Sequence, residues 1–303
     1  MAKFIIQPHG RLNDWVAEEK GYFTEEGLDY WLNLDASYRT VPQLSAVFSK
    51  KPLKDQLHGA FERYAEGSGR KGGAKDAGDV SCACHWTVNQ SAKLEDGIMY
   101  GKAYSICEAA IVVPGDSKVM IPTDLKNIDV AVGYHSGSHY SALQALEIFL
   151  KPSEISLKFV GTSWSRVDAA LAKKVPAINV WGPQLYLLEQ KGFRRIVSTT
   201  FMMAFMFPVD VEPENVDKYL RALIRAQSDI DSEPEKYKKY FMVEIPERYR
   251  DEVDVRLFGI GERVVPQNYT QEMFERTQAW MHDRHIFDVG ENQGVSYSQA
   301  VHS

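Results

Sequence analysis

The spacing of apolar residues along the first positions of the chain alternates between strand and helix. Residues 4–7 form a short apolar run, and residues 12–20 place apolar side chains at helical spacing until Gly21. Residues 28–34 form a second short run. A strand, a helix and a strand in this order predict a βαβ unit, and therefore a parallel sheet covered by helices.

The same alternation predicts further elements beyond residue 77. Strands are expected at 78–81, 129–132, 155–160, 177–181 and 194–198. Helices are expected at 87–93, 140–150, 166–173 and 185–189. The series that begins at residue 129 predicts a second parallel sheet. The last third changes character, because residues 213–240 and 270–284 read as long amphipathic helices, which we expect to pack as a cap on the first lobe.

Composition places the chain among ordinary globular proteins. Its 303 residues are 44% apolar and 25% charged, which suits one large domain or two lobes. The net charge is −6, without a basic stripe interleaved with aromatic residues, so nucleic acid is excluded as a partner. The longest apolar run, residues 201–209, is far shorter than a membrane span, which excludes membrane insertion.

The N-terminus and the cysteines bear on the compartment. The first eight residues lack the basic and apolar regions of a secretion leader. Three cysteines are an odd number, and Cys82 and Cys84 are too close in sequence to staple distant segments. Reduced thiols favour a cytoplasmic protein. The alternative is a periplasmic or cell-surface protein whose leader has been removed.

Three segments carry a resemblance to a known family. Residues 15–28 read WVAEEKGYFTEEGL, residues 121–126 read IPTDLK ahead of VAVGYHSGS, and residues 188–194 read LEQKGFR. In this order and spacing they resemble solute-binding proteins of the thiamine-pyrimidine, sulfonate and nitrate type. The resemblance covers roughly residues 3–230.

This resemblance implies an α/β fold of the periplasmic-binding-protein type II architecture. Two parallel-sheet lobes would enclose a ligand cleft, with residues 1–107 and 208–303 in the first lobe and residues 108–207 in the second. The chain would cross between the lobes near residues 104–111 and 200–208. Most members are receptors of ABC importers, whereas a minority of similar proteins are cytosolic enzymes, including a desulfinase and a decarboxylase.

Ligands of open parallel sheets bind at the carboxyl ends of the strands, which directs attention to two segments of the first lobe. His9 and Arg11 follow the first strand, and the Arg11 guanidinium could grip a carboxylate or sulfonate. A solvated Arg11 and a capping His9 are equally consistent with the sequence. Cys82, Cys84 and His85 lie between a strand and a helix, where the helix dipole and an imidazole would favour a reactive thiolate. Buried, inert cysteines are the alternative.

Two segments of the second lobe are further candidates. The loop that opens the helix after residue 132 offers hydroxyls and backbone N–H groups for an anion. Its candidate ligand contacts are His135, Ser136, Ser138 and Tyr140, and His139 is a candidate proton carrier. Arg166 is a candidate second anion clamp and Trp181 a candidate aromatic wall, although core packing is an equal alternative for Trp181.

Cofactor and metal chemistry find weaker support. The chain lacks the nucleotide-binding, kinase and serine-hydrolase motifs, so no cofactor is expected. A metal site at Cys82, Cys84 and His85 would need a fourth ligand from His9, His135 or His139, and the paired spacing of structural zinc is missing. We therefore expect no metal.

Two functional hypotheses follow. In the first, the protein is an enzyme of the lyase or hydrolase class that acts on a small anion, aromatic or not, with Cys84 as nucleophile or acid and His85 or His139 as proton carrier. In the second, it is the substrate-binding protein of an ABC importer, with the permease as partner and no chemistry of its own. The sequence favours the first by a small margin.

Overall fold

The computed structural model describes residues 3–8, 10–33, 78–286 and 294–303. Its strands are β1 (Phe4–Ile6), β2 (Tyr30–Leu32), β3 (Ser81–Cys84), β4 (Ile98–Tyr100), β5 (Tyr104–Val113), β6 (Asp129–Val132), β7 (Ser156–Phe159), β8 (Ala177–Trp181), β9 (Arg194–Phe207), β10 (Arg263–Val265) and β11 (Val301–His302). Its α-helices are α1 (Leu12–Lys20), α2 (Tyr22–Glu25), α4 (His85–Lys93), α5 (Gly137–Leu146), α6 (Ser163–Leu171), α7 (Gly182–Gln190), α8 (Pro213–Ser232), α9 (Pro234–Tyr237), α10 (Phe241–Glu244), α11 (Glu247–Arg250), α12 (Gln271–Asp283) and α13 (Tyr297–Ala300). Short 3₁₀ turns lie at Pro122–Leu125, Pro152–Glu154, Lys238–Tyr240 and Val255–Leu257.

The strands form one large mixed sheet and one small parallel sheet. The nine-stranded sheet runs β11-β4-β9-β5-β8-β6-β7, with β10 paired to β5 and β3 paired to β9, while β1 and β2 pair separately. The strands β6, β7 and β8 are parallel, whereas β5 and β9 pair antiparallel with each other and with their other partners. The predicted α/β class is confirmed. The sheet expected as a separate second one is continuous with the strands of the first lobe, because β5 pairs with β8 on one side and with β9 on the other.

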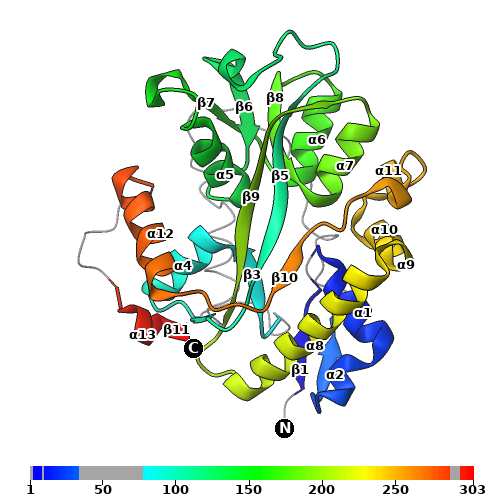
Figure 1. Ribbon diagram of the computed structural model, residues 1–303, viewed down its shortest axis with the longest axis vertical. Coiled ribbons are helices and arrows are strands. Elements are labelled where there is room, and N and C mark those ends of the chain that lie inside the picture. The colour runs from blue at the N-terminus through cyan, green and yellow to red at the C-terminus, as the bar shows by residue number, and fades with distance from the viewer. Residues whose placement is uncertain (1–2, 9, 34–77, 287–293) are drawn as a thin grey trace.

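Two long strands connect an upper and a lower part of the molecule. Figure 1 shows β5 and β9 running side by side from the part that holds β6, β7 and β8 to the part that holds α1, α2 and α8. These are the two crossings that the sequence predicts. We call residues 114–193, between the crossing strands, the second lobe, and the remaining described residues the first lobe. The predicted boundaries at 107/108 and 207/208 fall inside β5 and at the end of β9 and stay predictions.

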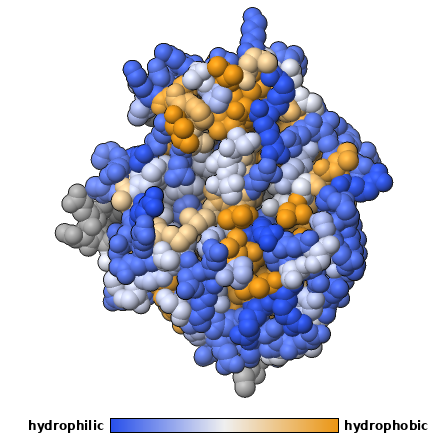
Figure 2. Space-filling model, in the orientation of Figure 1, coloured by the Kyte–Doolittle hydropathy of each residue, from blue (hydrophilic) through white to orange (hydrophobic). Residues whose placement is uncertain are grey.

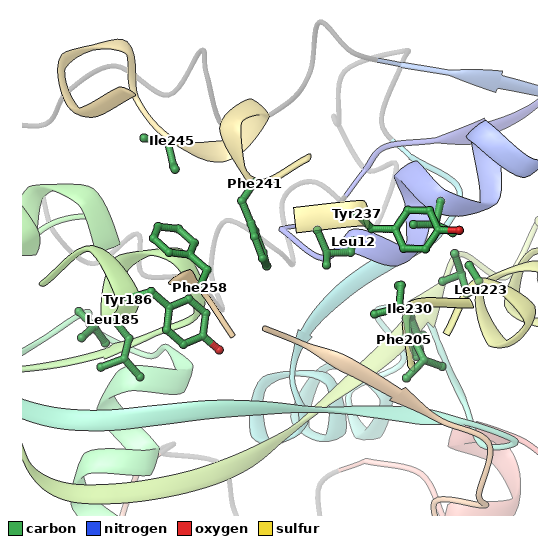
Figure 3. Packing of buried hydrophobic residues seen from close by; sticks show 14 of the residues in the cluster. Leu12, Leu185, Tyr186, Phe205, Leu223, Ile230, Tyr237, Phe241, Ile245 and Phe258 are labelled. Atoms are coloured by element: carbon green, nitrogen blue, oxygen red, sulfur yellow. The ribbon is translucent and has the colours of Figure 1, made fainter. Parts of the chain in front are cut away.

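The largest hydrophobic core continues from one lobe into the other. It contains Leu12 and Leu223 of the first lobe together with Leu185 and Tyr186 of α7 in the second. In Figure 3 Phe241 and Phe258 lie between these two groups, and the ring centroids of Phe258 and Tyr186 are 5.3 Å apart. The lobes are therefore packed together through side chains as well as joined by strands. Within the described residues, no helix has the length and apolar character of a membrane span.

Element boundaries agree with the sequence where the pattern is strong. Strands at 129–132 and 177–181 match residue for residue, and α1 ends at Gly21, whose φ of 72° is the left-handed conformation that glycine adopts most readily. The helix expected over 213–240 instead ends at Ser232, because Pro234 cannot continue it and begins α9. The helices α5, α6 and α7 each begin three residues earlier than expected, in polar or glycine-containing turns that apolar periodicity does not mark.

Candidate functional site

Arg11 lies inside the first lobe within a cluster of ionic partners. Its Nε is 2.9 Å from Asp14 Oδ2, its Nη1 donates to Glu262 Oε1 at 3.2 Å, and its Nη2 donates to the Tyr219 hydroxyl at 2.9 Å. Tyr219 in turn donates to Asp14 at 2.6 Å. The guanidinium also lies over the Phe205 ring at 5.1 Å. The Arg11 guanidinium, a candidate ligand contact from the sequence, is therefore paired with two carboxylates of the protein itself.

Cys82 belongs to the same cluster. Its Sγ donates to Glu262 Oε1 at 3.7 Å, and Ser105 donates to that same oxygen. Burial raises the pKa of the Cys82 thiol well above its usual range, and the Glu262 carboxylate raises it further. Cys82 is therefore a neutral thiol that supports the Arg11–Glu262 pair.

Cys84 ends β3 and is the N-cap residue of α4, whereas the sequence predicts a strand that ends at residue 81 and a helix that begins at residue 87. Its Sγ lies 3.1 Å from Thr87 Oγ1, and the side chain is buried. Burial raises the pKa of the thiol to about 11, and the hydrogen bond to Thr87 and the nearby backbone N–H groups only partly offset this. The thiolate that a nucleophile requires is thus disfavoured at neutral pH.

The His85 ring lies against the backbone of β9. Its Nδ1 lies 3.1 Å from the Met202 carbonyl, and its ring contacts Trp86 and Tyr269 at centroid distances of 4.0 and 6.4 Å. Burial lowers the pKa of the imidazole to about 4. Within the described residues, Cys84 has no hydrogen bond to a histidine, so the predicted thiol–imidazole pair is not assembled in this conformation.

The loop that precedes α5 is closed by its own serines. Ser136 Oγ donates to the Gly133 carbonyl at 2.8 Å, and Ser138 Oγ accepts from the Gly133 N–H at 2.8 Å. The two hydroxyls also lie 2.8 Å from each other. Ser136 is the N-cap of α5 but forms no side-chain capping bond. The serines therefore shape the turn, and the N–H groups of His139 and Tyr140 donate to the Ser136 carbonyl, which leaves the N–H groups of the first two residues of α5 outside the helix's own hydrogen bonds.

Arg166 of α6 lies beside this loop. A methyl group added at Gly133 would stand 2.7 Å from Arg166 Nη1 and 2.9 Å from Ser136 Oγ, so the guanidinium and the loop meet at Gly133. Arg166 is buried, donates to the Gly161 carbonyl at 3.2 Å and lies over the Trp181 ring at 5.6 Å. Arg166 and Trp181, both predicted from the sequence, are thus adjacent at the strand ends of the second lobe.

Gly137, the first residue of α5, is one of the points where the two lobes touch. A methyl group added there would lie 2.8 Å from the Phe201 ring of β9 and 3.3 Å from Cys84 Cβ. Phe201 also meets Trp181 edge-on at 5.9 Å and Trp86 at 6.2 Å. The sequence places Cys84 and the α5 loop more than fifty residues apart, and the fold brings them into contact.

The aromatic rings of the predicted loop form one stacked group, in which the His139 ring lies 5.1 Å from the Tyr140 ring. Tyr140 is buried against Trp86, with a centroid distance of 5.5 Å, on the side of the lobe junction. His135 stacks on Tyr134 at 3.9 Å and lies 6.3 Å from the ring of His139. His139 lines a surface hollow together with Leu143, Ile155, Leu157 and Phe159, between α5 and β7. Burial, with a smaller effect of His135, lowers the pKa of His139 to about 3.

One predicted site residue, His9, lies outside the described residues, and its role stays a prediction. Among residues 3–8, 10–33, 78–286 and 294–303, no group of three or more His, Cys, Asp or Glu side chains is arranged to hold a metal ion.

Sequence reasoning missed the side chains that hold these candidates in place. The partners of Arg11 are Tyr219 and Glu262, which are 208 and 251 residues away. Asn179 in β8 is fully buried and donates to the Ser138 carbonyl and to Ser141 Oγ, both at 2.8 Å, which fixes the first turn of α5. A polar residue inside the apolar run 177–181 was the one signal that could have found Asn179.

No protein-family model and no curated protein matches the sequence. Solved structures do match. The alkanesulfonate-binding protein SsuA from Xanthomonas axonopodis pv. citri, bound to MOPS, is 15% identical with a TM-score of 0.64, over 100% of this chain and 98% of that one. The sulfonate-binding SsuA of Escherichia coli is 14% identical with a TM-score of 0.66, over 99% and 92% of the two chains.

An enzyme is also among the similar structures. The desulfurization enzyme DszB, in complex with biphenyl-2-sulfinic acid, is 12% identical with a TM-score of 0.57, over 98% of this chain and 95% of that one. At these identities the likeness establishes the fold alone. The chain has the periplasmic-binding-protein fold that its sequence resemblance implies.

Proposed function

We propose that the protein is a solute-binding protein that takes a small organic anion of the sulfonate, sulfinate or carboxylate class. The observation that supports this proposal most strongly is that Arg166 lies beside Gly133 and the start of α5, with its guanidinium over the Trp181 ring. A guanidinium fork and backbone N–H groups suit the several oxygens of such an anion, and an indole face suits its organic part. The sulfonate-binding proteins with the same fold support this class of ligand. An ABC permease is the partner that the proposal implies.

The alternative is an enzyme that uses Cys84. Its contact with the start of α5 and the likeness to DszB favour this second candidate. Two observations weigh against it: burial raises the pKa of the thiol to about 11, and Thr87 rather than an imidazole lies against the sulfur. Binding without chemistry is therefore the better supported function.

Calorimetric titration tests the proposal with a panel of alkanesulfonates, arylsulfonates, a sulfinate and carboxylates, each beside an uncharged analogue. We expect at least one anion to bind, and Arg166→Met to weaken its binding at least about tenfold, since a charge-assisted fork is lost. Arg263→Met is the matched control, because Arg263 pairs with Asp231 on the first lobe. Failure of every anion to bind, or equal losses in both variants, contradicts the proposal.

The enzyme alternative is tested on the same panel by mass spectrometry of each ligand after incubation. Conversion of a ligand by the wild-type chain, abolished in Cys84→Ala with binding retained, would replace the receptor proposal by the enzyme. Unchanged ligand with both proteins supports binding without chemistry.

A further inference from the structure

Two segments of the C-terminal third extend from the first lobe to helices of the second. The first, residues 238–256, includes α11 and reaches α6 and α7, and we call it the α11 segment. The second is the end of α12, which reaches α5. Figure 1 shows them on opposite sides of the crossing strands β5 and β9. These two segments therefore connect the lobes in addition to the crossing strands and the shared core.

The α11 segment is held to α6 by a forked ion pair. Arg248 Nε and Nη2 donate to the two oxygens of Asp168 at 3.1 and 2.9 Å, and the Tyr249 hydroxyl donates to the same carboxylate. The Tyr249 ring stacks on Trp164 at 5.8 Å. A little further on, Gln190 of α7 exchanges two hydrogen bonds with the backbone of Asp254, at 2.9 and 3.0 Å.

The α11 segment is fixed at its other end to the first lobe. Tyr240 stacks on Trp15 of α1 at 6.0 Å and donates to Glu19. Lys238 Nζ donates to the Arg256 carbonyl at 3.0 Å, which ties the segment to the turn beyond α11. A movement of α6 away from α1 must therefore break contacts of the segment at one end or the other.

The α12 connection ends in a second forked pair. Arg284 Nε and Nη2 donate to the two oxygens of Glu147, at the end of α5, both at 2.7 Å. The Arg284 guanidinium lies over Trp280 at 4.6 Å, and Trp280 packs against Trp86 at 5.8 Å. At its start α12 is bound to α4, because Asn89 Nδ2 donates to the Phe274 carbonyl at 3.1 Å.

We propose that the Arg248–Asp168 and Arg284–Glu147 pairs form an electrostatic latch that holds the two lobes in the packed arrangement seen here. Both pairs are partly exposed, so salt screens them and they can exchange with water, unlike the buried Arg11 cluster. Arg166 and Cys84 are buried at or near the lobe junction, so the latch controls access to both. This inference concerns the motion of the lobes and stands whether or not the proposed ligand is right.

Cys84 supplies a probe of opening that needs no ligand. The protein is exposed to iodoacetamide at one fixed pH, and the alkylation rate of Cys84 is followed by peptide mass spectrometry in the otherwise unmodified chain. We expect the double variant Arg248→Gln/Arg284→Gln to react at least about tenfold faster, the combined effect of two forked pairs of modest strength. The wild-type rate is expected to rise with sodium chloride, and the double variant to have lost most of this dependence.

Three controls separate opening from general loosening. Arg263→Gln removes a first-lobe ion pair and should leave the rate unchanged. Leu223→Ala destabilises the first-lobe side of the core and should raise the rate less than the double variant does. Exchanging the charges in Arg284→Glu/Glu147→Arg should restore slow labelling that Arg284→Glu alone has lost. An unchanged rate in the double variant, a rate independent of salt in the wild type, or an equal increase in Leu223→Ala would overturn the latch.

Discussion

Arg11 and Arg166 each lie at or near the start of a helix, and each is only 2% exposed, yet they contact different groups. Arg11 is paired with the carboxylates of Asp14 and Glu262. Arg166 stands beside the glycine backbone and a serine hydroxyl, over an indole ring. Two equally buried arginines thus contact carboxylates in one lobe and a glycine-containing loop and an indole ring in the other. The contrast lies in these neighbours and not in the arginine side chain.

The largest effect should come from removing the charge of Arg11. We expect Arg11→Met to lower the free energy of unfolding by about 3–5 kcal/mol, because two buried carboxylates lose their partner. Urea unfolding measures it. A loss below about 1 kcal/mol would mean that the cluster is held by its neutral hydrogen bonds, and the contrast with Arg166 would fail.

Acid should destabilise the protein through His85, a buried side chain like Arg11 and Arg166, whose pKa in the folded state is about 4. Since an unfolded histidine has a pKa near 6.5, the unfolded chain binds more protons, and stability is lost as pH falls from about 6.5 to about 4. The contribution of His85 reaches up to about 3 kcal/mol at the lower end of that range. His139, with its pKa lowered to about 3, acts in the same direction.

Unfolding by urea at a series of pH values checks this. His85→Gln should show a visibly flatter fall in stability between those pH values than the wild type. Parallel curves for the two proteins would show that His85 is as accessible to protons in the folded state as in the unfolded state.

A glycine beside each arginine allows a matched pair of substitutions. We expect Gly133→Ala to destabilise the fold by about 1–3 kcal/mol, because the added methyl group would stand 2.7 Å from Arg166 Nη1. Anion affinity should fall with it, since the guanidinium must move. Gly10→Ala, next to Arg11, meets its nearest atom at 3.9 Å and should cost little. Thermal unfolding and calorimetric titration measure the two effects, and equal outcomes for the two variants would break the comparison.

The smallest effect concerns the helix caps. Thr162 Oγ1 accepts from the Ser165 N–H and caps α6, which carries Arg166. Thr162→Ala should therefore lower stability by about 1 kcal/mol. Ser136→Ala should not act through capping, because Ser136 makes no capping bond on α5. The midpoints of urea unfolding compare the two variants. A larger loss of stability in Ser136→Ala than in Thr162→Ala would mean that the hydrogen bond from Ser136 to the Gly133 carbonyl stabilises the protein more than the cap of α6 does.

Local patterns predicted the scaffold well and the site only in part. The runs at 129–132 and 177–181 are apolar enough to fix their strands. As the sequence predicts, the carboxyl ends of the strands bring Ser136, Arg166 of α6 and Trp181 of β8 into one region. Asp14 lies three residues after Arg11, and this helical spacing could have indicated the pair, although the pair was not predicted. Glu262 was not, because it follows a glycine-containing turn far along the chain that has no periodicity.

Burial explains why the cysteine chemistry was harder to predict. A thiol at a helix start is activated only if charge can develop there, and the sequence does not reveal how deeply that start is covered. In the structure Cys84 belongs to a cluster with Trp86, Tyr140 and Phe201, and its pKa rises accordingly.

Figure 2 shows mainly hydrophilic colour over the lower part of the visible face, with larger hydrophobic patches over the upper lobe and near the centre.

The strand β9 has a consequence for how the protein unfolds. It runs from Arg194 to Phe207 and pairs with β3 and β4 of the first lobe and with β5, which pairs in turn with β8 of the second lobe, while the largest core joins the same two parts. Neither lobe can lose its structure without exposing an edge and a core face of the other. Despite its two-lobed outline, the described part of the chain should behave as a single cooperative unit, with one calorimetric transition whose van't Hoff and calorimetric enthalpies agree.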